Sequence, residues 1–354
     1  MNEVEALVRI SKFAGERFDL VQAGGGNSSV KLDDDRMLIK ASGFSLSEVE
    51  QDSGYSKVST SMIAKIVENN EVLDANDKRT RESITANLVK EGTIDKENRP
   101  SIETLLHSLV YKYTLHTHPV VVNMVLNKPN YKEILSSLFD SDIVLVEYKT
   151  PGIELALELY EEINKFEVLP KLIFLQNHGL IVTSNELEDI ENLTNEVVDK
   201  ISKYLQMDMT KYKKTNKISK LLKQLDENEN ITYLSNDLEL NSLLKTDKSL
   251  FFKKPFCPDS LVYCGISGIE IKSFDDIESI NEYQKNYYEL PKVIIHDNDI
   301  FLSAKNIKKA KDMEDVLKFH ILVLAQDIKD VNYLELDELA YLSNWEAEKY
   351  RQKL

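Results

Sequence analysis

The stretch QAGGGNSSVKLDDDRMLIKASG, residues 22–43, combines three consecutive glycines with two short apolar segments on either side of an acidic turn. The segments SSVKL and RMLIKA have the length and composition of strands, and the turn at Asp33–Asp35 between them predicts a β-hairpin. Taken alone, the glycines are typical of a turn, but glycine also lets the backbone approach an anion closely. Two interpretations are therefore open, a plain turn or a cradle for negative charge.

Apolar spacing on either side of the hairpin predicts further helices and strands. A helix is expected over residues 2–19, where the glycines end it, and another over Ser101–Tyr113 behind Pro100, a residue that suits a helix entrance. Strands are expected at residues 80–90, up to His118, at 143–148 and at 171–184, with helices from Pro119 and over 185–207. This alternation predicts an α/β or α+β domain over residues 1–207.

The remaining sequence is expected to form a connection and a second unit. Residues 208–249 are polar and rich in lysine and asparagine, which predicts a partly helical connection without a core of its own. Residues 250–354 are expected to form a small C-terminal α/β domain, with a turn at 297–299, a strong helix after it, and Trp345 in a terminal helix. No internal repeat is evident.

Composition limits the class of protein. The chain has 354 residues, of which 42% are hydrophobic and 29% charged, as in soluble globular proteins. The net charge of −16 argues against nucleic-acid and anionic-membrane partners, because both require a basic face. The N-terminus lacks the basic start and apolar run of a signal peptide, so a cytoplasmic location is expected. Cys257 and Cys264 are expected to be reduced.

Three histidines have a spacing that suits metal binding. His116 and His118 alternate on a predicted strand, so their side chains leave from the same face. His178 ends another strand in LQNHGL, beside a glycine that allows a close turn. Three neutral imidazoles leave one position of a tetrahedral zinc ion open, which is the catalytic arrangement. A His-x-His pair by itself also occurs by chance, and that alternative stays open.

Glu103 is the carboxylate best placed to act beside such a metal. It lies at the start of the helix predicted behind Pro100, from where it could reach the open side of the metal as a base. The alternative is a first-turn glutamate that only complements the helix dipole. His107, one turn later, is expected to pack or to support the site, and His296 and His320 are expected to be structural.

The motifs GGGNSSVK, LIKASG, PSIETLLH, LHTHP and LQNHGLIV occur in the order and approximate spacing of the class II aldolase/adducin family. Over residues 5–205 the chain resembles this family, and it is most similar to the aldolase part of bifunctional rhamnulose-phosphate aldolase/dehydrogenases. The resemblance implies a three-layer αβα domain with a central, mostly antiparallel sheet. Residues 250–354 contain no glycine-rich dinucleotide fingerprint that would replace the missing dehydrogenase part.

The resemblance also implies individual roles. Glu103 matches the catalytic acid/base of the family, and the zinc ligands match His116, His118 and His178. The residues matching the substrate-phosphate site are Asn27, Ser29, Ser42, Gly43 and Ser101. Ile102 stands where the family has a second serine, which removes one expected phosphate contact. We add Lys40 as a cation that could compensate for this loss.

These roles together imply a class II aldolase, a carbon-carbon lyase that splits a ketose phosphate into dihydroxyacetone phosphate and an aldehyde. In this scheme zinc, or another divalent metal, stabilises the enediolate while Glu103 shuttles protons. A sugar-phosphate 4-epimerase or a dehydratase on the same zinc site is an alternative, although the epimerases typically have aspartate at the position of Glu103. A non-catalytic, adducin-like binding protein is a further alternative, against which the three retained histidines count.

The expected partner is therefore a small sugar phosphate, and the resemblance implies a homo-oligomer, a tetramer or a dimer. The sequence identifies neither the aldehyde half of the substrate nor the role of residues 250–354. Tyr350 in the tail is a further candidate for the site, with packing as its alternative.

Overall fold

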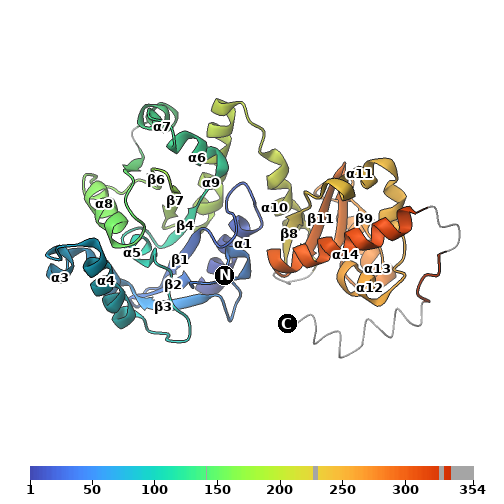
Figure 1. Cartoon of the computed structure of the whole chain (residues 1–354), viewed down its shortest axis with the longest axis horizontal. Helices are drawn as coiled ribbons and strands as arrows, with labels where there is room; N and C mark the ends of the chain where they lie inside the picture. The colour runs from blue at the N-terminus through green and yellow to red at the C-terminus, as the bar shows by residue number, and fades with distance from the viewer. Residues whose placement is uncertain (141, 226–229, 327–330, 336–354) are drawn as a thin grey trace. The chain divides into compact units, whose positions relative to one another are not determined.

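The structure, a computed structural model, describes residues 1–140, 142–225, 230–326 and 331–335 (Figure 1). It divides the chain into two compact units, Met1–Lys211 (unit 1) and Tyr212–Leu354 (unit 2). Each unit has a sheet of its own. The expectations for Trp345 and Tyr350 fall outside the described residues.

Unit 1 is built on a seven-stranded sheet with the order β3-β2-β1-β4-β7-β6-β5. Its strands are β1 (Asn27–Lys31), β2 (Arg36–Lys40), β3 (Tyr55–Ser59), β4 (Tyr113–Thr117), β5 (Val144–Val146), β6 (Leu172–Leu175) and β7 (Gly179–Ser184). Neighbouring strands are antiparallel except β5 and β6, which are parallel. The expected mostly antiparallel sheet is confirmed, and so is the hairpin, in which Ser29 of β1 lies opposite Ile39 of β2.

Helices flank the sheet of unit 1 in two layers (Figure 1). They are α1 (Glu3–Gly15), α2 (Thr60–Ala64), α3 (Asn70–Leu73), α4 (Lys78–Gly92), α5 (Thr104–Ser108), α6 (Val120–Leu126), α7 (Tyr131–Phe139), α8 (Ile153–Ile163) and α9 (Leu187–Leu205). Short 3₁₀ helices span Leu46–Glu48 and Lys65–Glu68. Helix α9 contacts α1 and α6, whereas α4, α5 and α8 share the core on the other face of the sheet. The three-layer α/β fold is confirmed.

Two expected elements of unit 1 differ from the structure. Residues 80–90 are not a strand but part of α4, where Asp77 caps the helix by accepting a hydrogen bond from the Thr80 N–H. Ile84 and Leu88, one turn apart, pack against the core, so a helical period decides this segment. The helix expected over 101–113 is only the short α5, because β4 begins at Tyr113.

Unit 2 contains a four-stranded sheet with the order β8-β11-β10-β9. Its strands are β8 (Ile231–Leu234), β9 (Ile269–Glu270), β10 (Val293–His296) and β11 (Asp299–Ala304). Its helices are α10 (Thr210–Leu222), α11 (Leu238–Thr246), α12 (Pro258–Cys264), α13 (Ile277–Tyr287) and α14 (Ile307–Ala325), with a 3₁₀ helix at Lys248–Phe252. The turn expected at 297–299 joins β10 to β11, and the strong helix expected after it is α14.

The expectation that residues 208–249 only connect two domains is corrected by unit 2. Strand β8 lies in this segment and pairs with β11, and α11 contributes Leu240 and Leu244 to the core. Helix α10 buries Ile218, Leu221 and Leu222, which recur at helical spacing among exposed lysines. The lysines make the segment look polar overall, while one face of the helix packs against the sheet.

The sheet of unit 2 repeats the topology of half of unit 1. The orders β4-β7-β6-β5 and β8-β11-β10-β9 have the same sequence of antiparallel, antiparallel and parallel pairs. The register also agrees: Leu172 lies opposite Val182 where Val293 lies opposite Leu302. Each set is preceded by one helix, α5 or α10, and followed by another, α9 or α14. The structure thus contains an internal repeat that the sequence does not show.

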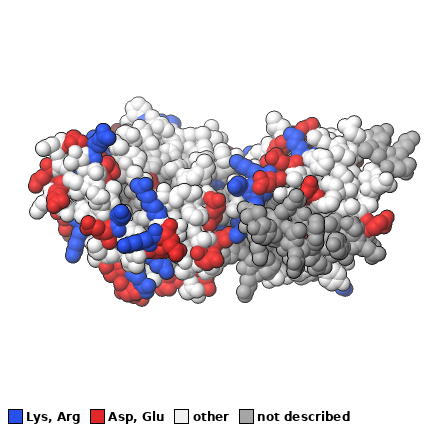
Figure 2. All heavy atoms as spheres, turned by 60° about the horizontal axis from the view of Figure 1, so that its bottom comes forward, with Lys and Arg blue, Asp and Glu red and all other residues white. Residues whose placement is uncertain are grey.

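The state of the cysteines and the distribution of surface charge agree with the expectations from composition. Both cysteines are free thiols, and Cys264 is buried. Figure 2 shows acidic and basic side chains interspersed on the visible face of unit 1. Within the described residues no helix has the length and apolar character needed to cross a membrane.

Candidate metal centre

Four side chains predicted from the sequence converge in unit 1. His116 and His118 come from the C-terminal end of β4, His178 from the turn between β6 and β7, and Glu103 from the N-cap position of α5. One potential ligand atom from each of these residues lies within 4.8 Å of the others. Residues up to 75 positions apart in the sequence, Glu103 and His178, are thus brought to one point by the sheet.

The spacing of the donor atoms fits a tetrahedral metal ion. The Nε2 atom of His116 lies 3.1 Å from Nε2 of His118 and 3.3 Å from Nε2 of His178. Oε1 of Glu103 lies 3.3 Å from Nε2 of His116 and 3.2 Å from Nε2 of His178. Metal-nitrogen bonds of about 2.0–2.1 Å place two tetrahedral ligands about 3.3 Å apart. The four residues therefore fit zinc or a similar divalent ion.

The hydrogen bonds of His116 leave the correct nitrogen for a metal. Its Nδ1 lies 3.1 Å from the carbonyl oxygen of Leu180, so Nδ1 donates its proton there and Nε2 carries the lone pair. In the neutral ring, Nε2 of His116 has one lone pair, so it cannot accept ordinary hydrogen bonds from both His118 and His178. A shared cation satisfies all three lone pairs, which is the chemistry expected of a metal centre.

Electrostatics couple Glu103 to the histidines. Burial alone would raise the pKa of the Glu103 carboxyl, but the charge and hydrogen bonds of His116 and His178 hold this pKa well below its ordinary value. Burial lowers and Glu103 raises the pKa of His116, with a net increase. Burial lowers the pKa of His118 to about 3. The depressed Glu103 pKa stabilises the fold at neutral pH, and this contribution is lost as the pH falls through the lowered value.

The backbone around His118 is held by a buried ion pair that the sequence does not reveal. The N–H groups of His118 and Val120 donate to the carbonyls of Leu20 and Asp19, each at 2.9 Å. The Asp19 carboxylate accepts from Nε of Arg17 at 3.0 Å, and both side chains are buried. Neither Arg17 nor Asp19 belongs to a recognisable motif. The only feature of the sequence that could have indicated the pair is two opposite charges shortly before the glycine run.

The glycine run lets the chain turn tightly behind the metal ligands. Gly26 has a positive φ of 77°, and a Cβ atom there would lie 2.9 Å from the carbonyl oxygen of His116. Gly179 is equally restricted, since its Cβ would lie 2.2 Å from the Thr117 carbonyl oxygen. Close approach of two backbone segments therefore explains why glycine occupies these two positions.

Replacing Gly26 with alanine is expected to lower stability by about 1–3 kcal/mol, because a side chain must adopt a left-handed conformation against β4. Thermal unfolding measures this loss, and metal titration is expected to show weaker binding. Gly24→Ala is the matched control, because a Cβ there meets nothing within 4 Å. Equal melting temperatures for the two variants would contradict this account of the turn.

Part of the predicted phosphate site is assembled from two loops. Ala41 and Pro100 form an isolated β-bridge, and the Ser42 N–H donates to the carbonyl of Arg99 at 2.8 Å. Ser42 and Gly43 thus lie beside the segment containing Ser101, all three at accessible positions. Asn27 lies opposite His116 in the sheet, and its buried Nδ2 has no hydrogen-bond partner among the described residues. These residues remain predicted phosphate contacts.

Two other predicted phosphate residues have partners inside unit 1. Oγ of Ser29 lies 2.7 Å from Nδ1 of His107, and both residues are fully buried. The ammonium of Lys40 donates to the carbonyl of Phe44 at 2.7 Å, and burial lowers its pKa despite the opposing charge of Glu103. The contact with Ser29 agrees with the packing or supporting role expected for His107. Ile102 is 60% exposed, so its side chain does not fill the core.

Comparisons with known proteins agree with this fold. The sequence profile of the Class II Aldolase and Adducin N-terminal domain matches residues 5–202. The chain is 25% identical over 207 residues to the 3-oxo-tetronate 4-phosphate decarboxylase of Haemophilus influenzae, covering 54% of this chain and 82% of that protein.

Solved structures resemble unit 1 in fold. The N-terminal class II aldolase domain of a conserved Thermoplasma acidophilum protein matches with a TM-score of 0.50 and 22% identity, covering 58% of this chain and 94% of that one. A sugar-phosphate aldolase from Thermotoga maritima matches with a TM-score of 0.42 and 17% identity, covering 57% and 94%. Because the family profile matches more than half of this chain, the chain belongs to the class II aldolase and adducin family.

Proposed function

We propose that this chain is a metal-dependent carbon-carbon lyase that cleaves a ketose phosphate to dihydroxyacetone phosphate and an aldehyde. The observation that carries the proposal is the convergence of Glu103 with His116, His118 and His178. A second proposal is that the metal is zinc, which the nitrogen-rich ligand set supports. We also propose a homo-oligomer in the cytoplasm, on the family resemblance and the composition.

The chemistry divides between a cation and a carboxylate. A divalent metal held by the three imidazoles would act as a Lewis acid toward the negative charge that develops when a bond next to a carbonyl breaks. Glu103 is ionised at neutral pH, so it can take a proton from a substrate hydroxyl and return one to the carbon that loses its partner. Only 11% of the Glu103 side chain is exposed, so most water is kept away from the proton transfer.

The loops beside Glu103 are proposed to bind the substrate phosphate. Ser101 accepts from the Glu103 N–H at 3.3 Å, so the residue proposed to bind phosphate is linked to the base by one hydrogen bond. Ser42 and Gly43 lie beside it through the Ala41 and Pro100 bridge. Phosphate binding there would fix the distance from the reacting carbon to Glu103.

Decarboxylation is a second candidate reaction, favoured by the similarity to the 3-oxo-tetronate 4-phosphate decarboxylase. Loss of carbon dioxide from a 3-oxo acid and retro-aldol cleavage both break a bond beside a carbonyl and leave an electron pair on carbon. From 3-oxo-tetronate 4-phosphate the product is dihydroxyacetone phosphate, as it is from a ketose 1-phosphate. The same Glu103 could protonate the carbon in both reactions.

A substrate panel distinguishes the two candidates. Metal-loaded protein is incubated with ketose 1-phosphates and with 3-oxo-tetronate 4-phosphate, and dihydroxyacetone phosphate, aldehyde and carbon dioxide are measured. We expect release of dihydroxyacetone phosphate together with an aldehyde, and loss of activity on chelation. Carbon dioxide in place of the aldehyde would identify the decarboxylase, whereas full activity of chelated, metal-free protein would reject both.

A further inference from the structure

The repeated sheet in unit 2 lacks the metal ligands of unit 1. The shared register puts Leu234 of β8 at the position of His116 in β4, and Asn236 at that of His118. The turn at 297–298 corresponds to the turn that carries His178. Beside this turn, Nζ of Lys214 lies 2.6 Å from Oδ2 of Asp299. Where unit 1 gathers metal ligands, the described part of unit 2 has an ion pair.

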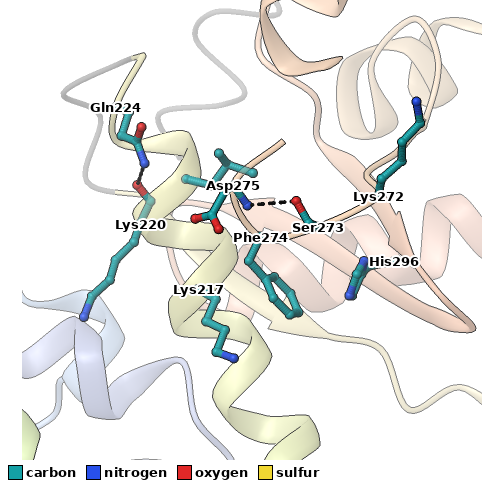
Figure 3. Close-up of a pocket in the computed structure, with 9 residues that line it drawn as sticks. Lys217, Lys220, Gln224, Lys272, Ser273, Phe274, Asp275 and His296 are labelled. Carbon is teal, nitrogen blue, oxygen red and sulfur yellow. Dashed lines mark hydrogen bonds between the residues drawn. The ribbon is translucent and has the colours of Figure 1, made fainter. Parts of the chain in front are cut away.

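Unit 2 instead has a cavity of about 530 Å³ on one side of its sheet. Figure 3 shows its walls: Lys217 and Lys220 on α10, Lys272 and Phe274 on the segment after β9, and His296 at the end of β10. In unit 1 the corresponding face is covered by α2, α4, α5 and α8, while in unit 2 the core on this face is formed with α10 and α13. The thinner helical layer leaves room for a ligand.

The charge of this cavity is opposite to that of the chain. Three lysines line it against one aspartate, Asp275, which leaves an excess of two positive charges in a protein whose net charge is −16. The net negative charge of the chain is therefore not expected to attract anions from a distance. An anion that binds in this cavity must be held by the local group of lysines. Lys272 lies at an exposed position after β9, where its backbone N–H donates to the Asp276 carboxylate at 2.9 Å.

An aromatic floor lies between the lysines. The rings of Phe274 and His296 are 4.3 Å apart at 58°, and Nζ of Lys217 lies 4.9 Å from the centre of the Phe274 ring. Nδ1 of His296 is 3.1 Å from the carbonyl oxygen of Ile271, which fixes this ring. Phe274 is half-buried, so its ring offers apolar surface to the carbon part of a ligand.

We propose that this cavity is a second, non-catalytic site that binds a small phosphorylated molecule. Its phosphate is held by Lys217 and Lys272 from opposite walls, and its carbon skeleton lies on Phe274. Figure 3 shows the lysine side chains pointing away from one another, so binding requires their flexible stems to turn toward the ligand. Ammonium groups suit this role because their hydrogen bonds to phosphate are charge-assisted.

Calorimetric titration of the full chain with glycerol 3-phosphate tests the proposal. The double variant Lys217→Ala/Lys272→Ala is expected to bind at this site roughly tenfold or more weakly, because two charge-assisted contacts are lost. Lys223→Ala, which removes another exposed lysine just beyond α10 that does not line the cavity, is expected to bind like the unmodified chain. Binding at the catalytic centre contributes equally to all of these proteins.

Unchanged affinity and stoichiometry in the double variant would overturn the proposal. An equal loss in Lys223→Ala would also overturn it, because only overall charge would then matter. If the double variant unfolds, Lys272→Ala alone repeats the test at an exposed position. Lyase activity of the variants is measured in parallel and is expected to be unchanged, so failure of this proposal and failure of the proposed function are distinguishable.

Discussion

Replacing His116 with alanine is expected to remove the bound metal and reduce lyase activity to background. This imidazole is fully buried, its Nε2 lies within 3.3 Å of the other two Nε2 atoms, and its orientation is fixed by Leu180. Loss of a ligand should weaken metal binding by more than the roughly 10–100-fold that accompanies loss of a ligand's hydrogen-bond partner. Metal content after dialysis and metal titration both measure this effect.

His320→Gln is the control for removing a buried imidazole. His320 lies in α14 of unit 2 and stacks on Phe256, with ring centroids 5.2 Å apart. Its replacement is expected to leave the metal content unchanged. Circular dichroism of both variants shows whether they remain folded. A folded His116→Ala variant that retains a full complement of metal would contradict the assigned ligand set.

Replacing Glu103 with glutamine is expected to lower turnover by about 10²–10⁴-fold while metal is retained. The amide keeps an oxygen near His116 and His178 but cannot carry a proton to and from carbon. The most specific measurement is exchange of the carbon-bound hydrogen of dihydroxyacetone phosphate in deuterated water. This exchange reports the protonation step shared by aldol cleavage and decarboxylation, so it does not depend on the choice between them.

Glu191→Gln provides the matched control for Glu103→Gln. Glu191, in α9, is also a buried glutamate of unit 1. Its Oε1, however, accepts a hydrogen bond from Nε of Arg9 at 2.8 Å. Its replacement is expected to reduce stability and to leave exchange unaffected in the folded protein. Undiminished exchange in Glu103→Gln would remove Glu103 from the mechanism.

The convergence of the three histidines was predictable from the sequence because their spacing encodes geometry. His116 and His118 share a face of β4 through the two-residue period of a strand, and the glycine after His178 marks a tight turn. What the sequence could not give is the partner of each side chain. Ser29, expected at the phosphate, pairs with His107 in the interior, a contact between residues 78 positions apart. The Arg17 and Asp19 pair was missed because its role depends on the backbone hydrogen bond from Val120 to Asp19, which joins distant parts of the chain.

The main errors in the fold come from segments with mixed patterns. Residues 80–90 carry few apolar residues, and only the spacing of Ile84 and Leu88 identifies the helix. The repeat in unit 2 is defined by strand order and register. Many different apolar residues can form the same strands in the same register, so the repeat leaves no fixed sequence pattern. Leu234 and Asn236 replace the histidines that would have revealed the relation between β8 and β4. Topology therefore persists where chemical motifs do not.

X-ray absorption spectroscopy of the zinc-loaded full chain tests the central claim most directly. The three imidazoles predict a shell of nitrogen ligands at about 2.0–2.1 Å, completed by oxygen, with outer-shell scattering from three imidazole rings that falls to two in His178→Ala. A spectrum with sulfur ligands, or one unchanged by His178→Ala, would contradict the assignment of His116, His118 and His178 as the metal centre.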